Sequence, residues 1–307
     1  MNIEMIKKEK HLIVLDLDGT TLIDYVKLGK KTIMILQKLI EKKHIVCIAT
    51  GRNSSALTFL KEIFKKTELD SFLITYNGAC IEKPLNLEKE KSLFVTIPIS
   101  NQISKEILTN EIIEKHSLNF MIDTTKKEII STSDDPYYRE IFFNNNPYVK
   151  KNKNEIINDL TKTNIDCFQI VLEFFDNKEI VNNVISTLRM KYKNSITFYC
   201  GSKLKELKKG DKILVPDKER MIIKIRNLNA NKGEAVKLIA GYHNISLEQN
   251  TIAFGNDIND IEMMKKVNLG IVLPDSDNNL KAYAHDITKY NSNDEGVADY
   301  LKEYFGL

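Results

Sequence analysis

The sequence predicts an α/β protein whose parallel sheet is built from two separate segments of the chain. Short apolar stretches at 12–15, 44–50 and 71–79 alternate with segments in which apolar residues recur at helical spacing. Strands that are apolar throughout are typical of a parallel sheet covered by helices on both faces. The alternation stops near Pro84 and returns at Asn231, so we expect a second domain to be inserted within the first.

The first segment contains three strands, and each ends in polar residues. The strand at 12–15 runs into Asp16 and Asp18, and the next helix has one apolar face formed by Leu28, Thr32, Ile35, Leu36 and Leu39. The strand at 44–50 ends at Gly51 and Arg52, and Ser54 is the expected N-cap of a helix carrying Leu57, Leu60 and Phe64. The third strand leads into Asn77 and Gly78.

The segment from 84 to 226 has a different pattern, with several strands of alternating character and few helices. Strands are expected at "SLFVTIPIS", "FMIDTT", "EIISTS", "DCFQIVLEFF", "SITFYCG" and "RMIIKIRN", and a helix at 178–192. These elements predict an inserted α+β domain with an antiparallel sheet. The lysine-rich run at 203–212 is interpreted as a solvated face or a hairpin turn.

The last segment resumes the first pattern and completes the core, which is expected to comprise residues 1–83 and 227–307. A helix over 231–242 is predicted to bury one face, with strands at 251–254 and 269–273. The residues expected on that face are Ala235, Leu238, Ile239 and Tyr242.

Composition excludes several classes of protein. The net charge of +3 over 307 residues is too small to indicate a nucleic-acid or membrane partner. No apolar run approaches the roughly 20 residues that span a bilayer. The cysteines Cys47, Cys80, Cys167 and Cys200 lie far apart, without a CxxC pair, and are expected to be small core residues in a reducing compartment. These features predict a cytoplasmic protein, and the oligomeric state stays open.

Polar residues gather where the strands end. In an open α/β sheet the ligand site lies at the carboxyl ends of the strands, so these side chains are expected to meet. A dense cluster of carboxylates needs a cation, and oxygen ligands beside a phosphate suit Mg²⁺. A carboxylate repels a phosphate by about 4 kcal/mol per pair of unit charges at 4 Å and an effective dielectric near 20, which a divalent ion removes. The residues of this cluster are Asp16, Asp18, Thr50, Lys232, Asn256, Asp257, Asn259 and Asp260.

Four motifs occur in a fixed order: "DLDGTTL", "IATGR", "NKGEAV" and "FGNDINDIEMM". They resemble the four motifs of the haloacid dehalogenase-like (HAD) phosphatases. The position and size of the insert, "TYNGA" and "NSNDEGVADYL" resemble the Cof-type branch, subclass IIB, which has a C2 cap. The resemblance implies a Rossmann-like core with an inserted cap domain.

The resemblance also implies roles for single residues. Asp16 would be the nucleophile that forms a phosphoaspartate and a ligand of Mg²⁺, and Asp18 the general acid and base, with its carbonyl on the metal. The Leu17 backbone N–H, Thr50, Gly51, Lys232 and Asn259 would bind the phosphate.

The fourth motif departs from the usual GDxxND pattern, because Asn256 stands where a metal-binding Asp is usual. An amide oxygen can ligate Mg²⁺ but carries no charge. Asn256 is the favoured ligand, with Asp257 and Asp260 in support. The alternatives are that Asp257 turns inward, or that it is a helix N-terminal acid stabilised by the helix dipole.

Other polar residues have two interpretations each. Arg52 either closes the phosphate site or anchors the residues beside Asp16 by a salt bridge. Asn77 either faces the substrate or caps a turn. In the insert, Asp123, Tyr137, Tyr138 and Arg139 are candidates for contacting the leaving group.

The leading functional hypothesis is a Mg²⁺-dependent phosphatase of small phosphorylated metabolites. The alternatives are a phosphomutase or phosphotransferase, which would pass the phosphoryl group to a hydroxyl, a receiver-like phospho-switch, and a degenerate scaffold that only binds phosphate. Receivers are shorter and place the phosphorylated Asp after the metal acids, which disfavours that class. The sequence lacks GxSxG, HExxH and P-loop patterns, so those enzyme classes are excluded.

Overall fold

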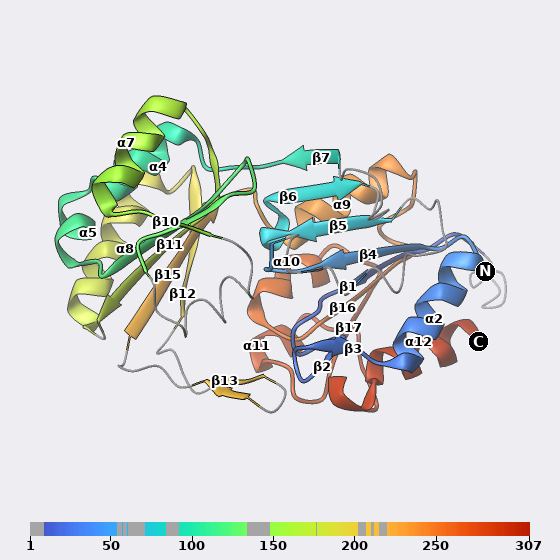
Figure 1. Ribbon diagram of the computed structural model, residues 1–307. Helices are drawn as coiled ribbons and strands as arrows, with labels where there is room; N and C mark the ends of the chain where they lie inside the picture. Colours follow the sequence, from blue (N-terminus) through green and yellow to red (C-terminus); the bar gives the residue numbers. More distant parts are fainter. Residues whose placement is uncertain are drawn as a thin grey trace. The chain divides into compact units, whose positions relative to one another are not determined.

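The computed structural model describes residues 9–53, 57, 60, 71–83, 92–133, 148–175, 177–201, 207–209, 212–214 and 220–307 (Figure 1). The chain forms two compact units. The larger comprises Met1–Val95 and Asn231–Leu307, and the smaller comprises Thr96–Ala230.

The larger unit is built on an eight-stranded sheet in the order β18-β17-β16-β1-β4-β5-β6-β7. Six of these strands are parallel: β1 (Leu12–Leu15), β4 (Ile45–Ala49), β5 (Phe72–Thr75), β16 (Thr251–Gly255), β17 (Leu269–Val272) and β18 (Asp286–Ile287). β6 (Cys80–Lys83) runs antiparallel to β5, and β7 (Ser92–Thr96) lies at the edge. In the centre, Leu15 pairs with Ile48 on one side and Phe254 on the other, so the two chain segments share one sheet.

Helices cover both faces of this sheet. On one face, Ile13 and Leu15 pack in a buried cluster with residues of α2 (Lys30–Glu41) and α12 (Gly296–Phe305). On the other, Leu12 and Val14 pack with residues of α9 (Lys232–Tyr242) and α10 (Ile261–Met264). The predicted parallel sheet between two helical layers is confirmed.

Three short elements complete the larger unit near the strand ends. β2 (Leu22–Ile23) and β3 (Lys27–Leu28) form a hairpin just after β1, and α11 (Asn278–Lys281) follows β17. Single 3₁₀ turns occur at Tyr76–Gly78, Ile258–Asp260 and Ser292–Asp294.

Helix α2 begins without a side-chain cap of its own at Gly29. Instead, Glu295 Oε2 accepts hydrogen bonds from the backbone N–H of Thr32 at 2.7 Å and from its hydroxyl at 2.9 Å. A Cβ at Gly29 would lie 2.0 Å from the Glu295 carboxyl group, so glycine permits this close approach. A carboxylate at a helix N-terminus accepts hydrogen bonds from N–H groups that have no partner within the helix. Its negative charge also interacts favourably with the helix dipole.

Two expectations for the larger unit need correction. The sequence predicts β7 as part of the insert that begins after residue 83, but β7 is an edge strand of the large sheet. In α9, Leu238 and Tyr242 are 41% and 48% exposed, and the buried face is formed by Lys232, Gly233, Ala235, Val236, Ile239 and Ala240. A Cβ at Gly233 would lie 2.2 Å from the Glu262 carbonyl oxygen, so small residues, rather than the largest apolar ones, face α10 here.

The smaller unit contains a six-stranded sheet in the order β10-β9-β8-β11-β15-β12. Its strands are β8 (Asn119–Thr124), β9 (Ile129–Ser131), β10 (Val149–Lys150), β11 (Cys167–Phe175), β12 (Ile196–Gly201) and β15 (Arg220–Asn227). Neighbouring strands of this sheet pair antiparallel, except β9 with β10, which are parallel. Residues of one sheet face form a core with the helices α4 (Asn101–Leu108), α5 (Glu111–His116), α7 (Lys153–Thr163) and α8 (Lys178–Tyr192).

Other expectations have mixed outcomes. Strands β13 (Leu207–Lys209) and β14 (Lys212–Leu214) pair antiparallel, in agreement with a hairpin in the lysine-rich run. Cys47, Cys80 and Cys167 are buried as expected, whereas Cys200 is partly exposed, and none of these four described cysteines forms a disulfide. No helix in the described ranges has the length and apolar character needed to cross a membrane. The expected N-cap Ser54 lies outside the described residues.

Candidate active site

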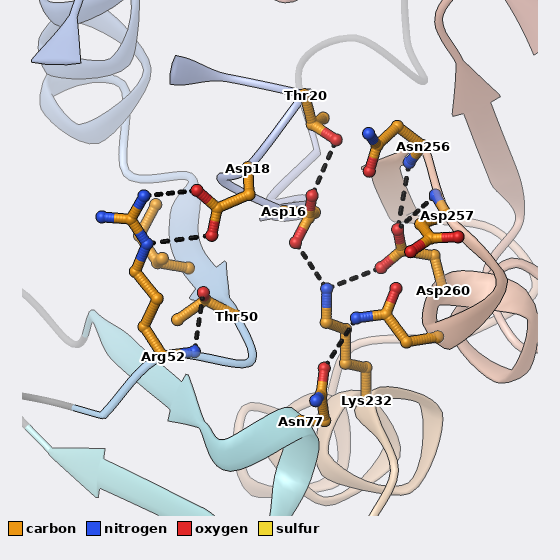
Figure 2. A network of polar contacts seen from close by, with 12 residues as sticks. Asp16, Asp18, Thr20, Thr50, Arg52, Asn77, Lys232, Asn256, Asp257 and Asp260 are labelled. Carbon is orange, nitrogen blue, oxygen red and sulfur yellow. Dashed lines mark hydrogen bonds and ion pairs between the residues drawn. The ribbon is translucent and has the colours of Figure 1, made fainter. Parts of the chain in front are cut away.

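The polar residues at the strand ends all come from the larger unit and converge at one edge of its sheet (Figure 2). Asp16 follows β1 directly, Thr50 follows β4, and Asn256 follows β16. These three strands are parallel neighbours, so their carboxyl ends lie at the same edge. The convergence expected from the sequence is therefore present.

Lys232 links Asp16, which follows β1, to Asp260, which lies in the turn after β16. Its Nζ lies 2.6 Å from Asp16 Oδ1 and 2.7 Å from Asp260 Oδ1, and the side chain is fully buried. The lysine stands at the start of α9, where the Asn231 side chain caps the helix by accepting from the N–H of Glu234. Burial disfavours the ammonium, but the two carboxylates outweigh it and raise the pKa of Lys232 above its ordinary value. Lys232 is therefore a fixed positive charge.

Asp16 is almost completely buried, with 4% of its surface exposed. Its Oδ2 accepts a hydrogen bond from the Thr20 hydroxyl at 2.8 Å, and its carbonyl accepts one from the Thr21 hydroxyl at 2.6 Å. Burial raises the pKa of Asp16 to about 7, although Lys232 opposes this. The carboxyl group is thus oriented on both oxygens by residues of the same site.

The loop after Asp16 is held by backbone contacts. The carbonyl of Leu17 accepts N–H groups from Thr20, Thr21 and Leu22, and the Leu17 side chain is buried in the core. Gly19 has φ +72°, a left-handed conformation that glycine adopts without strain. This tight loop sets the direction of Asp18.

Asp18 is paired with Arg52. Arg52 Nε lies 2.9 Å from Asp18 Oδ2, its Nη2 contacts Asp18 Oδ1, and Nη2 also donates to the carbonyl of Tyr25 at 2.7 Å. A bidentate pair of this kind fixes both position and orientation. The structure therefore has the salt bridge beside Asp16 that was one of the two interpretations of Arg52.

The remaining residues join the ends of β4, β5 and β16. The backbone N–H groups of Asn77 and Arg52 donate to the carbonyl and hydroxyl of Thr50, at 2.9 and 3.1 Å. Asn259 Nδ2 donates to Asn77 Oδ1 at 2.7 Å, and Asn77 itself has φ 54°. A Cβ at Gly51 would lie 3.0 Å from Asn77 Nδ2. Asn77 therefore faces the other site residues while it occupies a turn.

The turn after β16 uses its two carboxylates in different ways. Asp260 is fully buried, and its Oδ2 accepts the N–H groups of Asn256 at 3.0 Å and Asp257 at 3.2 Å, while Oδ1 contacts Lys232. Asp257 is exposed and caps the 3₁₀ turn, with Oδ1 accepting from the N–H of Ile258. This is the helix-terminal role considered for Asp257.

The oxygen atoms present are chemically suited to Mg²⁺, which binds few protein ligands and keeps several waters. In the described part of the chain, no group of three or more His, Cys, Asp or Glu side chains is placed to hold a metal ion. The candidate donors are instead mixed: the Asp16 carboxylate, the Asp18 carbonyl and the Asn256 amide. A Cβ at Gly19 would lie 2.1 Å from Asn256 Nδ2, so the Asn256 side chain lies against the loop after Asp16.

Three contributors were missed in the sequence. Thr20 and Thr21 position Asp16, and their hydroxyls next to the two acids were a visible signal. Tyr25 supplies only a carbonyl, from a hairpin tip where Asp24 and Tyr25 both have positive φ, and no sequence signal marks it.

The candidates in the insert belong to the smaller unit. Asp123 is buried on β8, accepts a hydrogen bond from Gln169 Nε2 at 3.1 Å, and its pKa is raised to about 7 by burial. Tyr137, Tyr138 and Arg139 lie outside the described residues.

Comparison with known proteins decides the family. The family model for haloacid dehalogenase-like hydrolases matches residues 13–301, which is nearly the whole chain. The chain belongs to this family. The HAD-type fold, the ordered motifs and the site at the strand ends are thereby explained together.

Curated relatives and solved structures are similar to this chain over nearly its whole length. The chain is 25% identical over 299 residues to the 5-amino-6-(5-phospho-D-ribitylamino)uracil phosphatase YitU of Bacillus subtilis, covering 97% of this chain and 98% of the relative. It is 27% identical to a putative phosphatase of Buchnera aphidicola, with 96% and 98% covered. A haloacid dehalogenase-like hydrolase from Bacteroides thetaiotaomicron has a TM-score of 0.73 at 20% identity, covering 96% of this chain and 99% of that one. The HAD subclass IIB sugar phosphatase BT4131 has a TM-score of 0.70 at 18% identity, with 96% and 99% covered.

Proposed function

We propose that this HAD-family hydrolase is a Mg²⁺-dependent phosphatase of small phosphorylated metabolites that works through a phosphoaspartate on Asp16. The observation that carries the proposal is the fixed Asp16 carboxylate, held by Lys232 and Thr20 at the edge where the strand ends meet. Several similar proteins are named phosphatases, which supports a phosphorylated substrate.

In the first half of the reaction, an Asp16 oxygen forms a bond to phosphorus while the bond from phosphorus to the leaving oxygen breaks. The leaving oxygen takes a proton from the Asp18 carboxyl group. Both Asp18 oxygens contact Arg52, so this pair must open before Asp18 carries a proton. Lys232, Thr50 and Asn259 supply positive charge and donors for the phosphoryl oxygens.

In the second half, Asp18 accepts a proton from water, the water oxygen bonds to phosphorus, and the Asp16 oxygen is released. Inorganic phosphate leaves and Asp16 is restored. Mg²⁺, held by the Asp16 carboxylate, the Asp18 carbonyl and the Asn256 amide, would supply charge neutralisation between carboxylate and phosphate. In this proposal, every other contribution comes from the side chains of Asp16, Asp18, Thr50, Lys232 and Asn259.

The substrate is proposed only as a class. YitU and a second relative from Bacillus subtilis, YcsE, carry names that specify a phosphorylated ribitylamino-uracil. At 25% identity to each, these names support a small phosphorylated metabolite.

The test is hydrolysis of an aryl phosphate by the full chain, with and without Mg²⁺. We expect turnover that requires the ion and falls on the order of a thousandfold or more in Asp16→Asn, because the nucleophile is lost. Asp299→Asn, on α12 and paired with Lys31, is the matched control and should keep full activity. Activity retained in Asp16→Asn would refute the mechanism, and phosphoryl transfer to an added alcohol in preference to water would replace the phosphatase by a phosphotransferase.

A further inference from the structure

The site has fewer free carboxylates than its sequence suggests. The fourth motif supplies Asp257 and Asp260, but Asp260 is fully buried and both its oxygens are engaged, by Lys232 and by two backbone N–H groups. Asp257 is exposed and accepts the N–H of Ile258 as a cap. Asp260 therefore has no oxygen left for a cation beside Asp16, and Asp257 lies at the exposed surface of the turn.

The side chain that does reach the loop after Asp16 is an uncharged amide. The position of a Cβ at Gly19 falls 2.1 Å from Asn256 Nδ2, and Figure 2 shows Asn256 on the side of Asp16 where Thr20 lies. The backbone of Asn256 is fixed by Asp260 and by the N–H of Asp277, which donates to the Asn256 carbonyl at 2.9 Å. The amide is thus held in place by its backbone.

The local charges can be counted from these contacts. Asp16 and Asp260 carry two negative charges against one positive charge on Lys232, and Asp18 is balanced by Arg52. With Asn256 neutral, this leaves a single net negative charge to meet a divalent cation. The site with the cation bound therefore carries a net charge of +1, and a phosphate anion beside the cation supplies negative charge that the protein lacks.

We propose that the divalent cation and the phosphoryl group bind this site as a coupled pair, and that Asn256 causes the coupling. The free protein then binds the cation weakly, and phosphate increases its affinity. By linkage, the cation increases the affinity for phosphate by the same factor. The inference rests on the proposed function for the location of the phosphate, but it concerns binding and not turnover.

The test measures Mn²⁺ binding to the full chain by electron paramagnetic resonance of the free ion, with and without inorganic phosphate. We expect phosphate to tighten Mn²⁺ binding by about tenfold or more in the wild type, which is in the range of typical coupling between sites. Asn256→Asp should tighten phosphate-free binding by about tenfold or more, because it adds a charge beside the cation, and should reduce the phosphate effect to about threefold or less.

Two further variants control the comparison. Asn244→Asp makes the same substitution in the exposed turn after α9 and should leave Mn²⁺ binding unchanged. Asp257→Asn should also have little effect, and a large loss of phosphate-free Mn²⁺ affinity in this variant would identify Asp257 as the ligand and overturn the proposal.

The wild type alone can also decide against the proposal. Equal Mn²⁺ affinity with and without phosphate refutes it, even if Asn256→Asp fails to fold. The outcome is separate from that of the proposed function. A protein that is inert toward phosphate esters but shows coupled binding loses the phosphatase proposal and keeps this one. An active protein in which phosphate does not change the Mn²⁺ affinity keeps the phosphatase proposal and loses this one.

Discussion

Replacing Lys232 by methionine removes the positive charge at the centre of the site while roughly keeping the volume of the side chain. In the wild type, Lys232 Nζ lies 2.6 Å from Asp16 and 2.7 Å from Asp260, and neither Lys232 nor Asp260 is exposed. The variant leaves two buried carboxylates facing each other without a cation. We therefore expect Lys232→Met to destabilise the metal-free protein strongly.

The size of the effect follows from two opposing contributions. At an effective dielectric of about 20, two unit charges 2.6 Å apart attract by about 6 kcal/mol. Removal of the ammonium also removes the cost of burying it, so the net loss is smaller. Breaking a buried pair by removing one partner typically costs about 3–5 kcal/mol, and we expect a loss in this range.

The pH dependence has a definite sign. Burial raises the pKa of Asp16 to about 7 in the folded protein, above its ordinary value of 3.8. The folded state therefore binds the proton more tightly, and the free energy of unfolding falls as the pH rises from 3.8 toward about 7. Loss of Lys232 raises the pKa of Asp16 further, so the defect of the variant should be greater at pH 8 than at pH 5.5.

Urea unfolding in the presence of a chelator measures this, at both pH values. Lys266→Met is the control, because Lys266 pairs with Glu234 at 2.8 Å but both side chains are partly exposed, and it should cost at most about 1 kcal/mol. A Lys232→Met variant that unfolds within about 1 kcal/mol of the wild type at pH 8 would show that the triad does not hold buried charges, and the reasoning would fail.

Three other changes have expected outcomes. Glu295→Ala should lower the free energy of unfolding by about 1–2 kcal/mol in thermal denaturation, because Thr32 at the start of α2 loses its acceptor, whereas Glu295→Gln should cost less. Burial lowers the pKa of His44 from 6.5 to about 4, so the free energy of unfolding should fall by up to about 3 kcal/mol as the pH drops from 6.5 toward 4. In urea titrations at pH 7.5, 6 and 5, His44→Phe should reduce this dependence on pH. Gly19→Ala should reduce aryl phosphate hydrolysis about tenfold or more, since its Cβ would displace Asn256, and unchanged activity would contradict the contact.

Much of the larger unit could be predicted from the sequence because strand ends and motifs carry local signals. The apolar strands at β1, β4 and β16 are bounded by polar residues, and parallel pairing then brings those residues to one edge. The convergence of Asp16, Thr50 and Asn256 follows from this rule without knowledge of any side-chain contact.

The contacts that could not be predicted join residues far apart in the chain. Glu295 caps α2 through Thr32, which lies 263 residues earlier in the chain, and the sequence around Glu295 does not indicate which helix it contacts. The salt bridge of Asp18 with Arg52 depends on how the turn after β4 orients the arginine. The Arg52 backbone is held by its N–H, which donates to the Thr50 hydroxyl, and by its carbonyl, which accepts from the N–H of Tyr76. In α9, periodicity correctly predicted that Ala235 and Ile239 are buried but was wrong for Leu238 and Tyr242, because close packing on α10 selected small residues such as Gly233.

The turn after β16 shows why a motif can be found in a sequence before its chemistry is understood. Counting acids suggests two carboxylates for a cation, but Asp260 accepts two N–H groups of its own turn and contacts Lys232 of the preceding motif. Asp257 is used at the surface of the same turn. Because Asn256 is uncharged, it adds no negative charge beside Asp16, whereas an aspartate at this position would add one. A phosphate dianion approaching this edge meets less repulsion than it would with a second free carboxylate, because each unit pair at 4 Å contributes about 4 kcal/mol at an effective dielectric near 20.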